Sequence, residues 1–172
     1  MNKFRTNYVI LVDKLPLDIM SEKPSIVSEA AVAYYRKTKM SVYDILDVEV
    51  NQLNEPLHRV ETFRSGLKRK SFESLKEVTG LDNNSLASAL AVSAKTLQRK
   101  EVFDVVQSEK MYELAELYAL GTGYFGRDGF RRWMDRPLFT LGNRKPIELI
   151  DVSEGIDLLK TEIMRLQHGI AI

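Results

Sequence analysis

Apolar positions recur at helical spacing through most of the chain beyond its N-terminal stretch. Phe72, Leu75 and Val78 lie at i, i+3 and i+6, which places them on one face of a short helix. Two further short stripes follow the polar cluster 82–85 and Ser93, and both of these positions suit a helix N-cap. Alternating, strand-like patterns are scarce. The pattern therefore predicts an all-α protein.

Longer apolar stripes over 108–121, 128–137 and 151–169 predict three more helices in the C-terminal half. Glu154 lies three residues after Asp151, which is the spacing of a capping box at the start of the last of these helices.

The first 57 residues are less regular. Tyr8–Val12 fits either a short strand or an apolar anchor. Ser25–Arg36 fits a helix, and Ser41–Leu53 fits a second helix with its apolar residues at mixed spacing. The apolar run at 8–12 is too short for an export signal, and no segment reaches the roughly 18–20 apolar residues of a membrane helix. We assign no chemistry to this region and expect no membrane partner.

The composition is that of a compact globular protein. The 172 residues include 25 Lys and Arg, 24 Asp and Glu, two His and no Cys. A chain of this length forms one compact unit or two small ones with a shared core. Without cysteine there is no disulfide framework, no thiolate catalysis and no Cys-ligated metal, and the composition fits a reducing, cytoplasmic setting.

The net charge of +1 hides an asymmetry along the chain. Residues 1–57 carry a net charge of −1, residues 58–100 of +5, and residues 101–172 of −3. A basic middle between acidic flanks indicates that one part of the molecule faces a polyanion, although a solvated charged surface gives the same count.

Gly121, Gly123 and Gly126 match the spacing of a dinucleotide-binding fingerprint. That site needs a strand before the glycines and a helix that opens at the last one. A helical stripe precedes them here, so we read Gly121 as a helix C-cap and the others as loop residues. His58 and His168 have no catalytic neighbours in sequence. We therefore expect no enzyme activity, no cofactor and no bound metal.

Residues 86–99 have the layout of a helix-turn-helix. Ala87 is small where a second helix crosses, and Val92 and Leu97 are apolar positions that hold the pair together. The outward side chains that we expect to contact DNA are Ser93, Lys95, Thr96, Gln98, Arg99 and Lys100. The alternative is an ordinary helical hairpin with charged outer faces, but the motif coincides with the basic segment.

The turn of this motif departs from the usual sequence. Ala91 stands where glycine normally permits a positive φ. Either alanine adopts that conformation at a cost of about 1 kcal/mol, or the turn has a different shape.

Several strings in the second half resemble the MbcA/ParS/Xre antitoxin family. They are Thr96–Arg99, Ser108–Glu109, Leu114–Ala115, Trp133–Pro137, Leu141–Pro146, Gly155 and Leu166–Ile170. The resemblance covers roughly residues 71–172. Ala91 departs from the family pattern, as does Met134, which replaces the more usual leucine with a side chain of similar volume.

This resemblance implies a type II antitoxin with an Xre-like helix-turn-helix domain and a small helical toxin-binding domain. The partner would be a RES-type toxin, which resembles ADP-ribosyltransferases and uses NAD, and the operator DNA would lie in the antitoxin's own promoter. The predicted parts are a poorly defined N-terminal extension of unclear function over 1–70, the helix-turn-helix region over 71–107 and the toxin-binding domain over 108–172.

We expect the exposed turns and the C-terminus to contact the toxin. The residues are Arg136, Asn143, Arg144, Lys145, His168, Gly169, Ile170 and Ile172. The apolar terminus has an equal alternative, which is to fold back on its own domain. Helical spacing favours the core for Trp133, Met134 and Phe139, although such side chains also anchor interfaces.

Two other functions fit parts of the sequence. A stand-alone transcriptional regulator would use the helix-turn-helix without a toxin, and a nicotinamide enzyme would use the glycines at 121–126. Readers of DNA half-sites usually act as symmetric dimers, so we also expect a homodimer, formed through the first 57 residues or the helix at 111–120.

Overall fold

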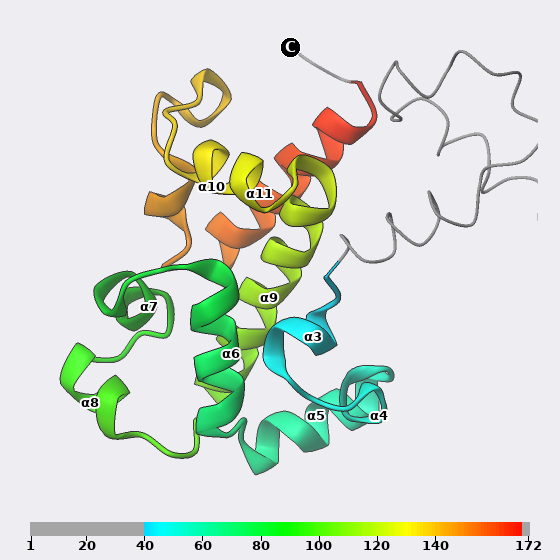
Figure 1. Ribbon diagram of the computed structural model, residues 1–172, viewed down its shortest axis with the longest axis vertical. Coiled ribbons are helices and arrows are strands. Elements are labelled where there is room, and N and C mark those ends of the chain that lie inside the picture. The colour runs from blue at the N-terminus through cyan, green and yellow to red at the C-terminus, as the bar shows by residue number, and fades with distance from the viewer. Residues whose placement is uncertain (1–39, 170–172) are drawn as a thin grey trace, which may run out of the picture. The chain divides into compact units, whose positions relative to one another are not determined.

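The computed structural model describes residues 40–169, and within that range the fold is all-α (Figure 1). The described part contains nine α-helices, two 3-10 helices and no strand, which confirms the predicted fold class. The helices are α3 (Val42–Leu46), α4 (Val50–Leu53), α5 (Pro56–Ser65), α6 (Arg69–Thr79), α7 (Asn83–Ala89), α8 (Ala94–Arg99), α9 (Val105–Phe125), α10 (Arg127–Met134), η2 (Phe139–Leu141), η3 (Pro146–Leu149) and α11 (Ser153–Gln167). The elements expected at Tyr8–Val12 and Ser25–Arg36 lie outside the described residues.

The stretch with mixed apolar spacing forms two short helices, α3 and α4. Ser41 and Asp44 form a capping box at the start of α3. The helix stops at Asp47, which adopts a left-handed conformation with φ of 48°. Ile45 and Leu53 are buried, and α3 packs against both α6 and α9. These N-terminal helices therefore share the core of the helix-turn-helix region.

Local signals set the ends of α6, α7 and α8 as the sequence predicts. Gly80 ends α6 with φ of 68°, and Asp82 caps α7 by accepting a hydrogen bond of 2.7 Å from the Ser85 amide. Ser93 caps α8 by accepting a 3.1 Å bond from the Thr96 amide. Each cap satisfies an amide that the first helical turn leaves unpaired.

Helix α9 is longer than predicted at both ends. It begins after Asp104, which forms a capping box with Gln107, and not after Ser108. Ser108 is fully buried inside the helix, where its hydroxyl accepts from the Leu67 amide and donates to the Phe103 carbonyl. The serine thus ties the start of α9 to the segment before α6.

The expectation that Gly121 ends this helix is wrong. α9 continues to Phe125, and Gly126, with φ of 70°, ends it. The ring of Phe130 from α10 packs directly on the backbone at Gly121, where any Cβ would collide with it. Gly121 is therefore a close-packing position, and Gly123 lies in the helix and not in a loop.

Helices α9 and α11 lie side by side and run parallel, held by polar contacts along their length. Lys110 donates to Ser153 at 2.8 Å, and Tyr124 donates to the Leu166 carbonyl at 3.1 Å. The capping box predicted at Asp151 and Glu154 does not form, because α11 begins one residue later, after Val152, without a side-chain cap.

Trp133 and Met134 lie in the core, at 9% and 3% exposure. The ring of Trp133 stacks against Phe125 and Phe130. The same expectation for Phe139 is wrong, because this side chain is 86% exposed. It lies in the 3-10 helix η2, outside any helical stripe. Within residues 40–169, no helix is both long and apolar enough to cross a membrane.

Candidate functional site

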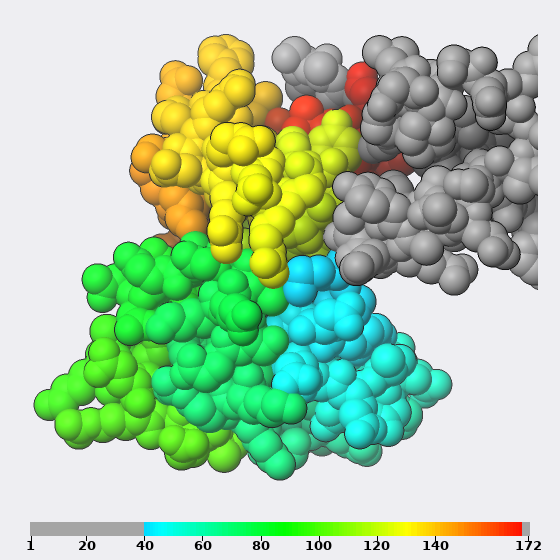
Figure 2. Space-filling model, viewed as in Figure 1, coloured from blue at the N-terminus to red at the C-terminus, as the bar shows by residue number. Residues whose placement is uncertain are grey.

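Helix α8 lies at the edge of residues 40–169, with its outer side uncovered by other described elements (Figure 2, green, lower left). Its only buried side chain is Leu97, at 1% exposure, which packs inward while α8 contacts α7. Lys95, Gln98 and Arg99 are exposed, as the inward position of Leu97 predicts. The helix therefore presents one amide and two cationic side chains to solvent.

The two hydroxyl residues at the start of α8 bond to each other. The Ser93 and Thr96 hydroxyl oxygens lie 2.8 Å apart, in addition to the capping bond from the Thr96 amide. Both residues are exposed. They fix the first turn of the helix. Since their mutual bond uses one hydroxyl hydrogen, the other hydroxyl keeps its hydrogen to donate to an acceptor such as a phosphate oxygen.

Four of the six predicted DNA-contacting residues line one hollow in the surface. These are Lys95, Thr96, Arg99 and Lys100. Lys100 is the least available of them, because it is half-buried and its ammonium bonds Asp104 at 2.9 Å. Since Asp104 also caps α9, this ion pair joins the end of α8 to the start of the next helix. Ser93 and Gln98 are not among the residues that line this hollow.

Arg69 on α6 is a residue that sequence reasoning missed. Its guanidinium donates a 2.6 Å hydrogen bond to the Leu97 carbonyl and forms an ion pair with Glu73. The same group lies over the ring of Phe72, with 5.0 Å between Cζ and the ring centroid. It thereby binds a carbonyl near the C-terminal end of α8. The sequence shows only the Glu73 spacing, and the contact with α8 has no local signal.

The basic segment does not face one way. Lys70 forms an ion pair of 2.7 Å with Asp47, and Arg59 donates to the Leu53 carbonyl at 3.0 Å. These cations join the N-terminal helices to the rest of the fold. The net +5 of residues 58–100 is thus partly structural. Four of its cations are exposed without an ion pair among the described residues: Lys95 and Arg99 on α8, Arg64 on α5 and Lys68 before α6.

The turn between α7 and α8 keeps the shape that a helix-turn-helix needs. Ala91 adopts φ of 53°, the left-handed conformation that glycine usually supplies. The Val92 amide bonds the Ala87 carbonyl at 2.9 Å and the Ala91 amide bonds the Ser88 carbonyl at 3.0 Å, which is a Schellman motif. Of the two possibilities for Ala91, the strained alanine is the one observed.

A second candidate surface surrounds a tight hairpin between α10 and η3. Leu138 and Arg144 pair across it, and the Asn143 amide bonds the Leu138 carbonyl at 2.9 Å. Arg136, Asn143 and Arg144 are exposed, as expected of residues near turns. In Figure 1 this hairpin (orange, above α10) lies at the end of the structure away from α8.

Lys145 is the least available of the predicted toxin-contacting residues in this hairpin. Its ammonium bonds the Asp135 carboxylate at 2.8 Å, and this bond raises the pKa of the lysine. The side chain is only partly exposed. Lys145 therefore fastens the base of the hairpin to the end of α10.

His168 and Gly169 end the described part of the chain and are both exposed. His168 is the C-cap of α11, and Gly169 follows with φ of 71°. Ile170 and Ile172, the other two predicted toxin contacts at the terminus, lie outside the described residues.

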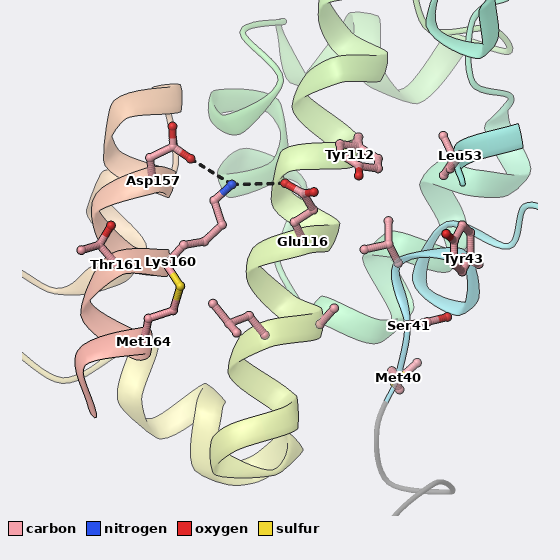
Figure 3. A pocket seen from close by; sticks show the side chains of 13 residues that line it. Met40, Ser41, Tyr43, Leu53, Tyr112, Glu116, Asp157, Lys160, Thr161 and Met164 are labelled. Carbon is pink, nitrogen blue, oxygen red and sulfur yellow. Dashed lines mark hydrogen bonds and ion pairs between the residues drawn. The ribbon is translucent and has the colours of Figure 1, made fainter. Parts of the chain in front are cut away.

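A groove of about 790 Å³ runs between α3, α9 and α11 (Figure 3). Lys160 lies on one side of it, ion-paired with Glu116 at 3.2 Å and Asp157 at 2.9 Å. Burial, reinforced by a hydrogen bond to Glu116, raises the pKa of Tyr112 in this groove to about 12. The charges bond one another and the rest of the lining is mostly apolar, so the groove suits an apolar group.

The described residues contain no cluster of three or more side chains able to hold a metal ion. The glycines at 121–126 lie within or at the end of α9, so they do not form the strand–loop–helix turn of a dinucleotide site. The exposed side chains of α8 and of the hairpin between α10 and η3 are mainly cations and amides. Both have the chemistry of recognition surfaces.

Two family models match the chain. The antitoxin Xre-like helix-turn-helix domain matches residues 58–116, from α5 into α9. The antitoxin Xre/MbcA/ParS C-terminal toxin-binding domain matches residues 120–169, from the end of α9 to the end of α11. The first match contains α8 and the second contains the hairpin. No curated protein is similar enough to the chain to count as a match.

Proposed function

The chain belongs to the Xre/MbcA/ParS antitoxin family, and from this we propose that it neutralises a RES-type toxin and represses its own operon. A helix-turn-helix domain and a toxin-binding domain on one chain make it a DNA-binding antitoxin. What we propose beyond the family assignment is that the toxin is of the RES type and that the chain represses its own operon. The chain acts by binding and carries out no chemistry of its own.

The observation that carries the DNA-binding half is the geometry of α8. A capped helix with Lys95, Gln98 and Arg99 exposed on its outer side fits the major groove, where Gln pairs with adenine and Arg with guanine. Lys100 and one of the two hydroxyls of Ser93 and Thr96 supply phosphate contacts around it. Since palindromic operators bind two-fold symmetric proteins, the proposal includes a homodimer.

The toxin-binding half rests on the C-terminal domain and its exposed basic hairpin. Arg136, Asn143 and Arg144 lie where a partner reaches them without unfolding any described element. His168, Gly169, Ile170 and Ile172 extend the proposed contact to the C-terminus.

Co-expression with the protein encoded by the adjacent reading frame tests the toxin-binding half. We expect the two proteins to copurify and the chain to rescue growth that the partner alone arrests. A RES-type partner would also deplete cellular NAD when it is expressed without this chain. Absence of both a complex and growth rescue would refute the antitoxin proposal.

DNA binding is tested with a fragment of the chain's own promoter. The matched pair is Arg99→Ala on α8 and Arg132→Ala, an exposed arginine on α10. Arg99→Ala should weaken binding by about 1–3 kcal/mol and Arg132→Ala should not. If a triple substitution at Lys95, Gln98 and Arg99 leaves binding intact, the docking model is wrong.

A stand-alone regulator remains the second candidate, and the exposed face of α8 supports it equally well. It predicts the same promoter binding by the free chain but no complex with the neighbouring protein. The nicotinamide enzyme loses its motif, because the glycines at 121–126 lie within or at the end of α9. It predicts that millimolar NAD raises the melting temperature, because a ligand that binds the native state stabilises it.

A further inference from the structure

Phe139 differs from the other aromatic side chains of the C-terminal domain. Phe125, Phe130 and Trp133 stack on one another with ring centroids 5.4–6.1 Å apart. Phe139 makes no ring contact with another described residue and is 86% exposed. A buried phenylalanine gains about 1.5–3 kcal/mol over an exposed one. Single exposed apolar residues are common, so a role for Phe139 needs further evidence.

The hairpin that carries Phe139 is held rigidly in the free chain. Besides the pairing of residues 138 and 144, the Gly142 amide bonds the Phe139 carbonyl at 3.0 Å. The Thr140 hydroxyl donates to the buried Glu162 carboxylate at 2.8 Å, which fastens the hairpin to α11. A side chain presented on a fixed backbone loses little conformational entropy on binding, as in rigid aromatic anchors of tight interfaces.

The charge around Phe139 is opposite to that of the domain as a whole. Residues 127–145 contain six basic and two acidic side chains, whereas 101–126 and 146–172 are each net acidic. Arg136 and Arg144 are exposed beside the hairpin, and no ion pair is found for either within residues 40–169. Arginine with an aromatic neighbour is the usual composition of an interface hot spot.

We infer that Phe139 is the anchor of the toxin-binding surface, entering an apolar pocket on the toxin whose rim carries carboxylates that pair with Arg136 and Arg144. The inference rests on the proposed function, because it takes the partner to be the toxin. An exposed phenylalanine gains most from a dry protein pocket, whereas phosphate needs only the arginines. The surface is therefore assigned to a protein and not to nucleic acid.

The test uses the full chain and the copurified product of the adjacent reading frame. Phe139→Ala should weaken the complex at least about 30-fold, and Phe139→Trp should retain affinity to within about fivefold. Leu57→Ala is the matched control, because Leu57 is a large apolar side chain on α5 that is 75% exposed. It should change affinity less than twofold.

The arginines are tested by the rate of association. The double variant Arg136→Ala with Arg144→Ala should slow association at low salt and reduce its dependence on ionic strength, because the attraction between these arginines and the toxin carboxylates steers the encounter.

A folding control accompanies the affinity test. The circular dichroism spectrum and melting temperature of Phe139→Ala should match those of the unmodified chain, since Phe139 contributes almost nothing to the core.

Two outcomes overturn the inference while leaving the antitoxin proposal in place. One is unchanged toxin affinity in Phe139→Ala. The other is a loss of operator affinity in that variant with unchanged toxin affinity, which would assign the surface to nucleic acid. If the unmodified chain binds no product of the adjacent reading frame, the proposed function itself fails and the inference fails with it.

Discussion

Replacement of Ala91 by glycine should stabilise this protein. The left-handed conformation costs an L-residue about 1–2 kcal/mol, and glycine adopts it without that cost. Glycine also makes the unfolded chain more flexible, which lowers the free energy of unfolding by about 0.4–1 kcal/mol. The Ala91 methyl is exposed, so its removal loses no core packing. The balance is a gain of about 0.5–1 kcal/mol in the free energy of unfolding.

Urea unfolding followed by circular dichroism measures this gain. The midpoint should rise in Ala91→Gly with an unchanged m-value, which reports a change in stability alone. The melting temperature should rise by about 1–4 °C for a chain of this size. Operator affinity should be unchanged, because the turn keeps its shape.

Ala119→Gly on α9 is the control for the glycine itself. Ala119 lies in a regular helical turn, where glycine costs about 1 kcal/mol relative to alanine. The two alanine-to-glycine changes should therefore have opposite signs. If Ala91→Gly is neutral or destabilising, the turn does not hold alanine under strain and the reasoning is refuted.

Three further variants test contacts elsewhere in the fold. Arg69→Gln should weaken operator binding about tenfold without changing its salt dependence, because Arg69 binds the Leu97 carbonyl and not a phosphate. If the slope of log affinity against log salt concentration falls by about one, this explanation is wrong. Gly155→Ala should lower the free energy of unfolding by about 1–3 kcal/mol in urea, since any Cβ there collides with the Leu149 carbonyl; normal stability would exclude that close packing. The hydrogen bond from the Ser85 amide lowers the pKa of the Asp82 carboxyl below its usual value. The stability that the charged Asp82 cap contributes is therefore lost as pH falls through that lowered pKa. Asp82→Asn caps without titrating, so unfolding midpoints of the two proteins should diverge on acidification below about pH 4, and parallel curves would refute the assignment.

The sequence predicts the helix-turn-helix well because its determinants are local. Asp82 and Ser93 are caps whose side chains bond amides three residues away, and the apolar spacing that buries Leu97 lies within one helix. The unusual alanine at position 91 can also be recognised from the sequence, because one known position in a Schellman motif requires a positive φ. Each of these features depends on residues that are neighbours in the chain.

The features that were missed depend on contacts between distant segments. The sequence alone indicates a helix end at Gly121, whereas the structure shows the Phe130 ring packed on this glycine. Arg69 likewise has the sequence context of a surface charge, but it binds the Leu97 carbonyl of α8. Helical spacing from Trp133 and Met134 predicts a core position for Phe139, but the α-helix ends before it and Phe139 lies in the short 3-10 helix η2. The spacing of apolar residues predicts which side of a long helix faces solvent, but η2 is too short to contain such a repeat.

The positions of the two candidate surfaces predict that they act independently. Arg99 lies on α8, which packs on α7, whereas Phe139 lies on a hairpin fastened to α11 through Thr140. Both halves pack on α9, and they also meet where Gly80 and Asp82 line one hollow together with Arg131 and Asp135 of the α10 region. Neither Arg99 nor Phe139 is among the residues that line this hollow. Effects at distant sites without shared partners add to within about 0.3–0.5 kcal/mol. The double variant Arg99→Ala with Phe139→Ala should therefore lose operator affinity as Arg99→Ala does and toxin affinity as Phe139→Ala does. A loss at either site that clearly exceeds its single-variant value would show that the contacts between the two halves couple the two surfaces energetically.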